Sequence, residues 1–162
     1  MAPATNDFQL RSVEPGDEEF IYRVYASTRQ EELAQTGWNK AQKEAFLRQQ
    51  FDTQDRYYKE HYGGAEFSVI LSEGLPGGRR YVIRWPGEIR IMDIALLPEY
   101  RGKGTGTSLL GALISESEEA EKTLSIHVER FNPALHLYER LGFRQKEDKG
   151  VYLLMERLPE LR

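Results

Sequence analysis

The 162-residue sequence contains no cysteine, which excludes disulfide bonds, thiolate metal sites and a cysteine nucleophile. It also lacks an excess of positive charge, because it contains 22 Lys and Arg residues and 26 Asp and Glu residues, which give a formal net charge of -4. A chain without a basic field of its own is not expected to hold nucleic acid through its phosphates. No metal site is predicted either.

Long apolar runs are missing as well. No window approaches the roughly 18 consecutive apolar residues of a membrane span. The opening segment MAPATNDFQL has no basic region followed by an apolar run, so it does not resemble a signal peptide. The length suits one ordinary domain, and 40% of the residues are hydrophobic, enough for a core. We expect a single soluble, cytoplasmic domain spanning residues 1–162.

Hydrophobic periodicity and turn residues predict the element order β α α β β β α β α β β. This order predicts an α/β fold with a mixed sheet of about seven strands flanked by about four helices. Two turns are predicted inside the sheet, one at LPGG (75–78) and one at Pro86 and Gly87. The predicted strands span 8–13, 65–74, 79–85, 88–97, 123–130, 142–148 and 151–158. The predicted helices run from 17 to near 37, from 39 to 62, from the glycine segment to about 122, and from 133 to 142.

The segment YRGKGTG places three glycines between a predicted strand and a predicted helix. It fits neither a Walker loop, which requires GK followed by Ser or Thr, nor G-x-G-x-x-G, because Thr107 occupies the last glycine position. A glycine-rich strand-to-helix loop exposes backbone N–H groups at a helix N-terminus, where an anion is favoured. The loop therefore indicates a phosphate-binding site, with a tight turn that binds nothing as the alternative.

Together with a second segment, this loop resembles the GNAT N-acetyltransferase superfamily. PEYRGKGTG is similar to the family's R/Q-x-x-G-x-G/A loop, and NPALHLYERLGF is similar to its second motif, with Asn132, Tyr138, Gly142 and Phe143 at the recurring places. Tyr138 follows Asn132 by six residues, where the family usually has seven. The resemblance implies the GNAT acyl-CoA transferase fold over nearly the whole chain.

The resemblance implies an enzyme that transfers an acetyl group from acetyl-CoA to a primary amine by direct attack in a ternary complex. The diphosphate of coenzyme A would bind the loop, and its pantetheine arm would pair with the end of the preceding strand. The N–H of Leu96 would stabilise the oxyanion. The implied coenzyme-binding residues are Ile94, Leu96, Leu97, Arg101, Gly102, Lys103, Gly104, Thr105, Gly106, Asn132 and Tyr138.

Three residues are candidates for the chemistry. The family's role for Tyr138 is to protonate the departing thiolate. A tyrosine pKa of about 10 exceeds a thiol pKa of about 8.5, so we expect Tyr138 to act mainly as a hydrogen-bond donor to the sulfur. His127, placed where some members carry a catalytic glutamate, and Glu88 are alternative general bases. Either could instead be a residue of a sheet face without a catalytic role.

The two N-terminal helices of this fold usually line the acceptor pocket, which points to Arg29, Glu32 and Trp38 as substrate-binding residues. Acidic and aromatic side chains suit a cationic amine, although a solvated helix end would look the same. The acceptor is a small-molecule or protein amine that the sequence does not specify. The resemblance also allows a homodimer, and a non-catalytic acyl-CoA sensor or scaffold on the same fold is the alternative function.

Overall fold

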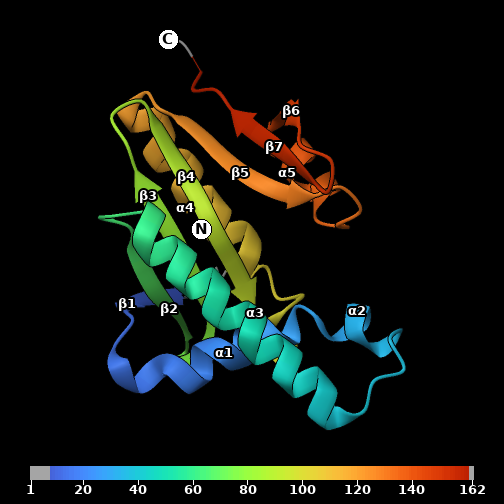
Figure 1. Ribbon diagram of the computed structural model, residues 1–162. Helices are drawn as coiled ribbons and strands as arrows, with labels where there is room; N and C mark the ends of the chain where they lie inside the picture. Colours follow the sequence, from blue (N-terminus) through green and yellow to red (C-terminus); the bar gives the residue numbers. More distant parts are fainter. Residues whose placement is uncertain (1–7, 161–162) are drawn as a thin grey trace. The chain divides into compact units, whose positions relative to one another are not determined.

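The computed structural model describes residues 8–160 (Figure 1). Its strands are β1 (Phe8–Ser12), β2 (Glu66–Ser72), β3 (Leu75–Arg84), β4 (Glu88–Leu96), β5 (Thr123–Glu129), β6 (Arg144–Asp148) and β7 (Tyr152–Arg157). Its α-helices are α1 (Glu18–Ser27), α2 (Gln30–Ala34), α3 (Lys40–His61), α4 (Thr105–Ala120) and α5 (Leu135–Arg140). Short 3₁₀ turns, η1 (Pro15–Asp17) and η2 (Pro98–Tyr100), precede α1 and follow β4.

The seven described strands form one mixed sheet in the order β1-β2-β3-β4-β5-β7-β6. Residues Glu88–Ile91 of β4 pair in parallel with Thr123–Ile126 of β5, whereas β7 is antiparallel to both β5 and β6. The parallel pair is joined by α4, the crossover that parallel strands need. The predicted α/β class and mixed sheet are confirmed, with five described α-helices in place of about four.

By their contacts the residues group into two compact units. Unit 1 contains the described residues up to Arg80 together with Ile94–Gly106, and unit 2 contains Tyr81–Asp93 together with the described residues from Thr107 onward. No helix among residues 8–160 is long and apolar enough to cross a membrane.

In unit 1, the predicted helix from 17 to 37 is wrong as a single element, because the chain breaks between α1 and α2. The hydroxyl of Ser27 donates to the carbonyl of Val24, and that of Thr28 donates to the carbonyl of Tyr25, both at 2.7 Å. Such side-chain bonds to carbonyls three residues earlier compete with the helical ladder. Two adjacent hydroxyl residues therefore mark the place where α1 ends.

Helix α3 begins at the predicted cap. The side chain of Asn39 accepts a hydrogen bond from the backbone N–H of Gln42 at 2.8 Å, and the side chain of Gln42 accepts one from the N–H of Asn39 at 2.9 Å. This reciprocal capping box satisfies two N–H groups that the helix leaves unpaired. Further along α3, Phe51 packs edge-on against Tyr22 of α1 with ring centroids 5.5 Å apart.

The first sheet turn does not lie at LPGG, as predicted, but two residues earlier. Glu73 and Gly74 both have positive φ, at 51° and 81°, the combination that tight hairpin turns require. Leu75–Gly78 instead opens β3. The turn at Pro86 and Gly87 is confirmed, since Trp85 and Glu88 exchange backbone hydrogen bonds across it.

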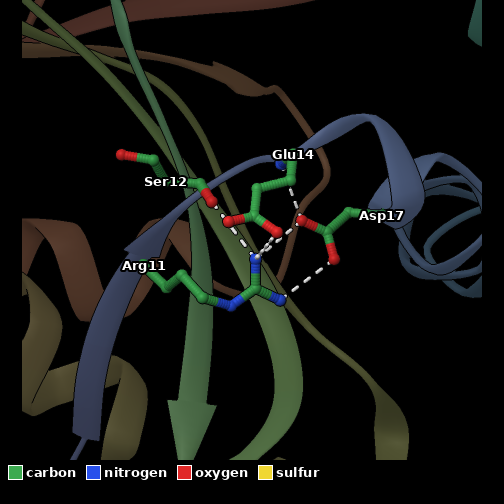
Figure 2. Close-up of polar contacts among 4 residues, drawn as sticks. All are labelled: Arg11, Ser12, Glu14 and Asp17. Carbon is green, nitrogen blue, oxygen red and sulfur yellow. Dashed lines mark hydrogen bonds and ion pairs between the residues drawn. The ribbon is translucent and has the colours of Figure 1, made fainter.

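The connection from β1 into α1 is fixed by a carboxylate (Figure 2). Both oxygens of Asp17 accept hydrogen bonds from the guanidinium of Arg11, at 2.8 and 2.9 Å, and one of them also accepts from the N–H of Glu14 at 2.7 Å. The hydrogen bond from Arg11 is the main reason that the pKa of Asp17 lies below its ordinary value.

Candidate functional site

The glycine-rich loop follows β4 and η2 in unit 1 and leads into α4. Gly102 and Gly104 have φ of 73° and 82°, in the left-handed region that residues with a Cβ adopt at a cost. Gly106 lies in the first turn of α4, and nothing lies within 4 Å of the position its Cβ would occupy. Two of the three glycines are thus required by backbone conformation, and the third leaves open space.

The two cations of the loop serve its own geometry. The Nε of Arg101 donates to the carbonyl oxygen of Leu96 at 2.8 Å, and its guanidinium reaches the hydroxyl of Ser27 at 3.4 Å. The ammonium of Lys103 lies 5.8 Å from the ring centroid of Tyr100. Arg101 therefore ties the start of the loop back to the end of β4. Thr105, the first residue of α4, is buried.

The end of β4 has a backbone edge that points away from β3. The N–H of Leu97 donates to the carbonyl of Gly77 in β3 at 2.8 Å. Consecutive N–H groups of an extended chain point to opposite sides, so the N–H of Leu96 is directed away from β3. Ile94 lies two residues earlier on the same strand and is half-buried. This is the edge at which the coenzyme arm is expected.

The close approach of β3 to the end of β4 depends on Gly78. A Cβ built there would lie 2.2 Å from the carbonyl oxygen of Ala95 and 2.9 Å from a methyl carbon of Leu96. No side chain fits at that position without backbone movement. The sequence LPGG, interpreted as a turn, is instead the close contact that fixes the end of β4.

Tyr138 lies on α5 in unit 2 and is 7% exposed. Its ring packs edge-on against Phe143, with centroids 5.5 Å apart. Burial, and secondarily the negative charge of Asp93, raise the pKa of Tyr138 to about 12. At neutral pH its hydroxyl is therefore protonated and can donate a hydrogen bond.

Asn132 has a local structural role. Its side-chain oxygen accepts from the backbone N–H of Ala134 at 2.8 Å, and its carbonyl accepts from the N–H of Leu135 at 3.0 Å. These bonds form the turn that starts α5, a common use of asparagine before a helix. The side chain of Asn132 is thus engaged with its own backbone.

Glu88, the second candidate base, belongs to a polar cluster on one face of the sheet. Its carboxylate accepts hydrogen bonds from the hydroxyl of Ser125 and from the guanidinium of Arg90, the latter at 3.0 Å. Arg90 also donates to the Ser125 hydroxyl at 3.1 Å. The sequence does not single out Ser125, because its partners lie 35 and 37 residues away and meet it only through strand pairing.

His127, the first candidate base, points to the same face as Ser125, two residues further along β5. It is half-buried. Burial is the main reason that the pKa of His127 lies below its ordinary value, and the positive charge of Arg90 acts in the same direction. The imidazole is accordingly neutral at pH 7 and able to accept a proton.

The three expected substrate-binding residues meet around an aromatic pair in unit 1. Arg29 forms an ion pair with Glu32, donates to the hydroxyl of Tyr25 at 2.6 Å and lies 5.6 Å from the ring centroid of Phe46. Trp38, 38% exposed, packs edge-on against Phe46 with ring centroids 5.3 Å apart. Tyr25 and Phe46 also belong to this cluster but were not predicted, although Tyr25 and Arg29 are spaced by four residues within the predicted helix.

The expected residues are therefore divided between the units. Unit 1 carries the loop, the end of β4 and the Arg29 cluster, whereas unit 2 carries Asn132, Tyr138, Glu88 and His127. Among the described residues, no group of three or more His, Asp or Glu side chains could hold a metal ion.

Comparison with known proteins identifies the class to which this arrangement belongs. A model of the acetyltransferase (GNAT) family matches residues 22–143. That match spans β2 to β5, the glycine loop and α5 with Tyr138. The chain belongs to the acetyltransferase (GNAT) family.

Two curated relatives are N-acetyltransferases. The ribosomal protein bS18-alanine N-acetyltransferase of Haemophilus influenzae is 39% identical over 66 residues, which are 40% of this chain and 45% of that protein. The N-alpha-acetyltransferase of Saccharolobus solfataricus is 33% identical over 115 residues, which are 59% of this chain and 68% of that protein. The match thus spans less than half the length of the first relative.

Solved structures share the fold at low sequence identity. The PaiA N-acetyltransferase of Thermoplasma acidophilum, solved in complex with coenzyme A, superposes with a TM-score of 0.69 at 17% identity, covering 94% of this chain and 99% of that one. The ribosomal-protein-S18-alanine N-acetyltransferase of Escherichia coli gives a TM-score of 0.63 at 19% identity, with 96% of each chain covered.

Proposed function

We propose that this protein is an acetyl-CoA-dependent N-acetyltransferase that transfers the acetyl group to a primary amine by direct attack in a ternary complex. The observation that carries the proposal is the loop after β4, where Gly102 and Gly104 adopt left-handed φ directly before α4. Membership of the acetyltransferase (GNAT) family supports it. Both curated relatives are N-acetyltransferases by name.

The loop has the features that a diphosphate needs. Left-handed residues such as Gly102 and Gly104 occur in the backbone concavities that bind anions, and the open position at Gly106 leaves room beside the first turn of α4. The N–H of Leu96, directed away from β3, would face the thioester oxygen. Acetyl-CoA, when bound, supplies an acetyl group activated as a thioester.

Tyr138 would donate a hydrogen bond to the sulfur as negative charge develops there. Its pKa of about 12 exceeds the thiol value of about 8.5 by about 3.5, so complete proton transfer would be uphill by about 5 kcal/mol. Hydrogen bonding to the sulfur has no such cost and still stabilises the developing charge. Burial thus supports the role of donor over that of acid.

His127 is our choice for the general base. A lysine-like amine with a pKa of about 10.4 is protonated at pH 7, and neutralising it costs about 4–5 kcal/mol, so a proton acceptor is useful. The carboxylate of Glu88 is engaged by Ser125 and Arg90, whereas the imidazole of His127 is held neutral. These contacts favour His127 over Glu88.

The acceptor would bind beside the cluster of Arg29, Trp38 and Phe46. Because Glu32 is already paired with Arg29, we expect aromatic contact from Trp38, more than the charge of Glu32, to hold the acceptor. The names of the curated relatives make the α-amine of a protein N-terminus the first acceptor to test.

The test combines binding with turnover. Calorimetry with acetyl-CoA, coenzyme A and ATP should show binding of the first two, and Gly104→Val, which forces a β-branched residue into a left-handed conformation, should abolish it. Gly111→Ala in α4, where the added Cβ has open space, is the matched control. Release of free thiol over a panel of peptide N-termini and small amines then measures turnover.

The outcomes separate the alternatives. Coenzyme binding with no thiol release from any amine would favour a non-catalytic acyl-CoA sensor. Undiminished acetyl-CoA affinity in a folded Gly104→Val variant would overturn the assignment of the loop.

A further inference from the structure

Glu88, Arg90 and Ser125 form a polar cluster in which the three side chains hydrogen-bond to one another. The three side chains form a triangle in which each contacts the other two, and Arg90 and Ser125 are direct partners in the β4–β5 pairing. Ser125 is 1% exposed. The side chains of Arg90 and Glu88 are only partly buried, at 17% and 31% exposed, and an ion pair that water still reaches contributes little to stability. The cluster therefore calls for a different explanation.

The hydrogen bonds of this triangle hold the positive charge of the Arg90 guanidinium in one position. The guanidinium of Arg90 uses Nε for Ser125 and one terminal nitrogen for Glu88, and it lies 5.1 Å from the ring centroid of Trp85. These contacts use the planar fork of arginine, which a lysine ammonium cannot reproduce.

His127 is the titratable neighbour of this fixed charge. It stands two residues beyond Ser125 on the same face of β5, which makes it a diagonal neighbour of Arg90 across the paired strands. On the other side of β5 its direct partner is Leu154 of β7, which is uncharged. The charged groups that act on His127 are Arg90 and Glu88 of β4, Glu147 of β6, and Lys149 just after β6.

Together these groups favour the neutral imidazole. Burial lowers the pKa of His127 most, Arg90 and Lys149 lower it further, and Glu147 and Glu88 oppose them. Arg90 and Glu88 thus shift the pKa of His127 in opposite directions, and the effect of Arg90 is the larger of the two.

We propose that Arg90 is a positioning residue that keeps the His127 imidazole neutral and able to accept a proton, and that Glu88 and Ser125 hold the guanidinium where it does so. The consequence for catalysis rests on the proposed function, in which His127 is the general base. In that reaction a proton leaves the amine for the free imidazole nitrogen, and the same cation then favours its release to water.

The direct test is an NMR titration of the histidine ring protons in the full chain without ligand. The chain has three histidines, so His61 of α3 and His136 of α5 are internal references and His127→Gln assigns the third signal. Arg90→Gln should raise the pKa of His127. Glu88→Gln should lower the pKa of His127, because it removes the opposing charge.

Arg90→Lys is the matched control, since it keeps the charge but loses the fork. We expect the pKa of His127 in Arg90→Lys to stay below that in Arg90→Gln. In kinetics, Arg90→Gln should move the acidic limb of kcat/KM to higher pH, so that the loss of kcat/KM is about threefold larger at pH 6 than at pH 8. A merely structural Arg90 would lower activity equally at both pH values.

The results distinguish this proposal from the function on which it rests. An unchanged pKa of His127 in both Arg90→Gln and Glu88→Gln overturns the role of Arg90, whichever residue is the base. If Arg90→Gln raises the pKa of His127 but leaves the pH dependence of kcat/KM unchanged, the role of Arg90 in keeping His127 neutral is confirmed. The same result shows that His127 is not the general base.

Discussion

Gly78→Ala adds a single methyl group at the place where β3 comes closest to the end of β4. Its Cβ would lie 2.2 Å from the carbonyl oxygen of Ala95, whereas real Cβ contacts essentially never fall below 3.0 Å. The strands must therefore separate by about 0.8 Å or more at this point, which is the difference between those two distances. Backbone on both sides of the contact leaves no flexible side chain to absorb the change.

A separation of that size affects both stability and catalysis. The hydrogen bond from Leu97 to Gly77 is 2.8 Å long and would be stretched beyond hydrogen-bonding distance. Overpacking of this kind typically costs about 1–3 kcal/mol in the free energy of unfolding. A displacement of about 1 Å near a reacting group can lower the rate about 100-fold. We therefore expect kcat/KM for acetyl-CoA to fall by about 10- to 100-fold in the folded variant.

Urea unfolding and thiol-release kinetics, measured side by side, check both numbers. Gly111→Ala is the control, because its added Cβ meets nothing within 4 Å and alanine replaces glycine inside a helix. That change should stabilise the protein by about 0.5–1 kcal/mol and leave kcat/KM unaltered. If Gly78→Ala matches wild type in both measurements, the close contact does not position the end of β4.

Three further substitutions test separate parts of the structure. Tyr138→Phe should lower kcat about 100-fold and change the KM for acetyl-CoA little; an unaltered kcat in steady-state assays would remove its role as donor. Asn39→Ala should cost about 1 kcal/mol in urea unfolding, whereas Asn39→Asp, which retains a capping oxygen, should cost much less. Asp17→Asn should lower the urea midpoint at pH 7. Because the pKa of Asp17 is depressed in the folded protein, its contribution is present above about pH 3.9 and is lost as the pH falls through the lower folded value. The difference in urea midpoint between Asp17→Asn and wild type should therefore become smaller toward pH 3. A difference that stays constant with pH would exclude the charge of Asp17 as its source.

Most of the fold could be predicted from the sequence, because its signals are local. The capping box at Asn39 and Gln42 and the glycines after α3 define that helix almost to the residue. The break between α1 and α2 was missed because no Gly or Pro lies between Asp17 and Gly37 to mark it, and the hydroxyls of Ser27 and Thr28 decide the outcome. The turn at Glu73 was missed because Pro and Gly in LPGG are typical of turns.

The candidate site could be predicted only where its residues are close in sequence. The loop from Arg101 to Gly106 is such a segment, and its left-handed glycines agree with the spacing. The environment of His127 could not be predicted in this way, because it depends on which residue of β4 lies beside Ser125, a residue distant in sequence. A shift of one residue in that register would turn Arg90 to the face of the sheet opposite His127.

Burial sets the protonation state of both groups that are proposed to handle protons, Tyr138 and His127. Burial disfavours whichever form of a group is charged, so it raises the pKa of Tyr138 and lowers that of His127. At neutral pH the first is then a protonated donor and the second a neutral acceptor, the two forms that the departing thiolate and the arriving amine require. The charge with the largest effect near each group reinforces burial, Asp93 at Tyr138 and Arg90 at His127, although Glu147 and Glu88 oppose it at His127. With its pKa at about 12, Tyr138 stays protonated over the whole range in which the protein would be assayed. If His127 is the base, as proposed, we therefore predict that His127 sets the acidic limb of activity.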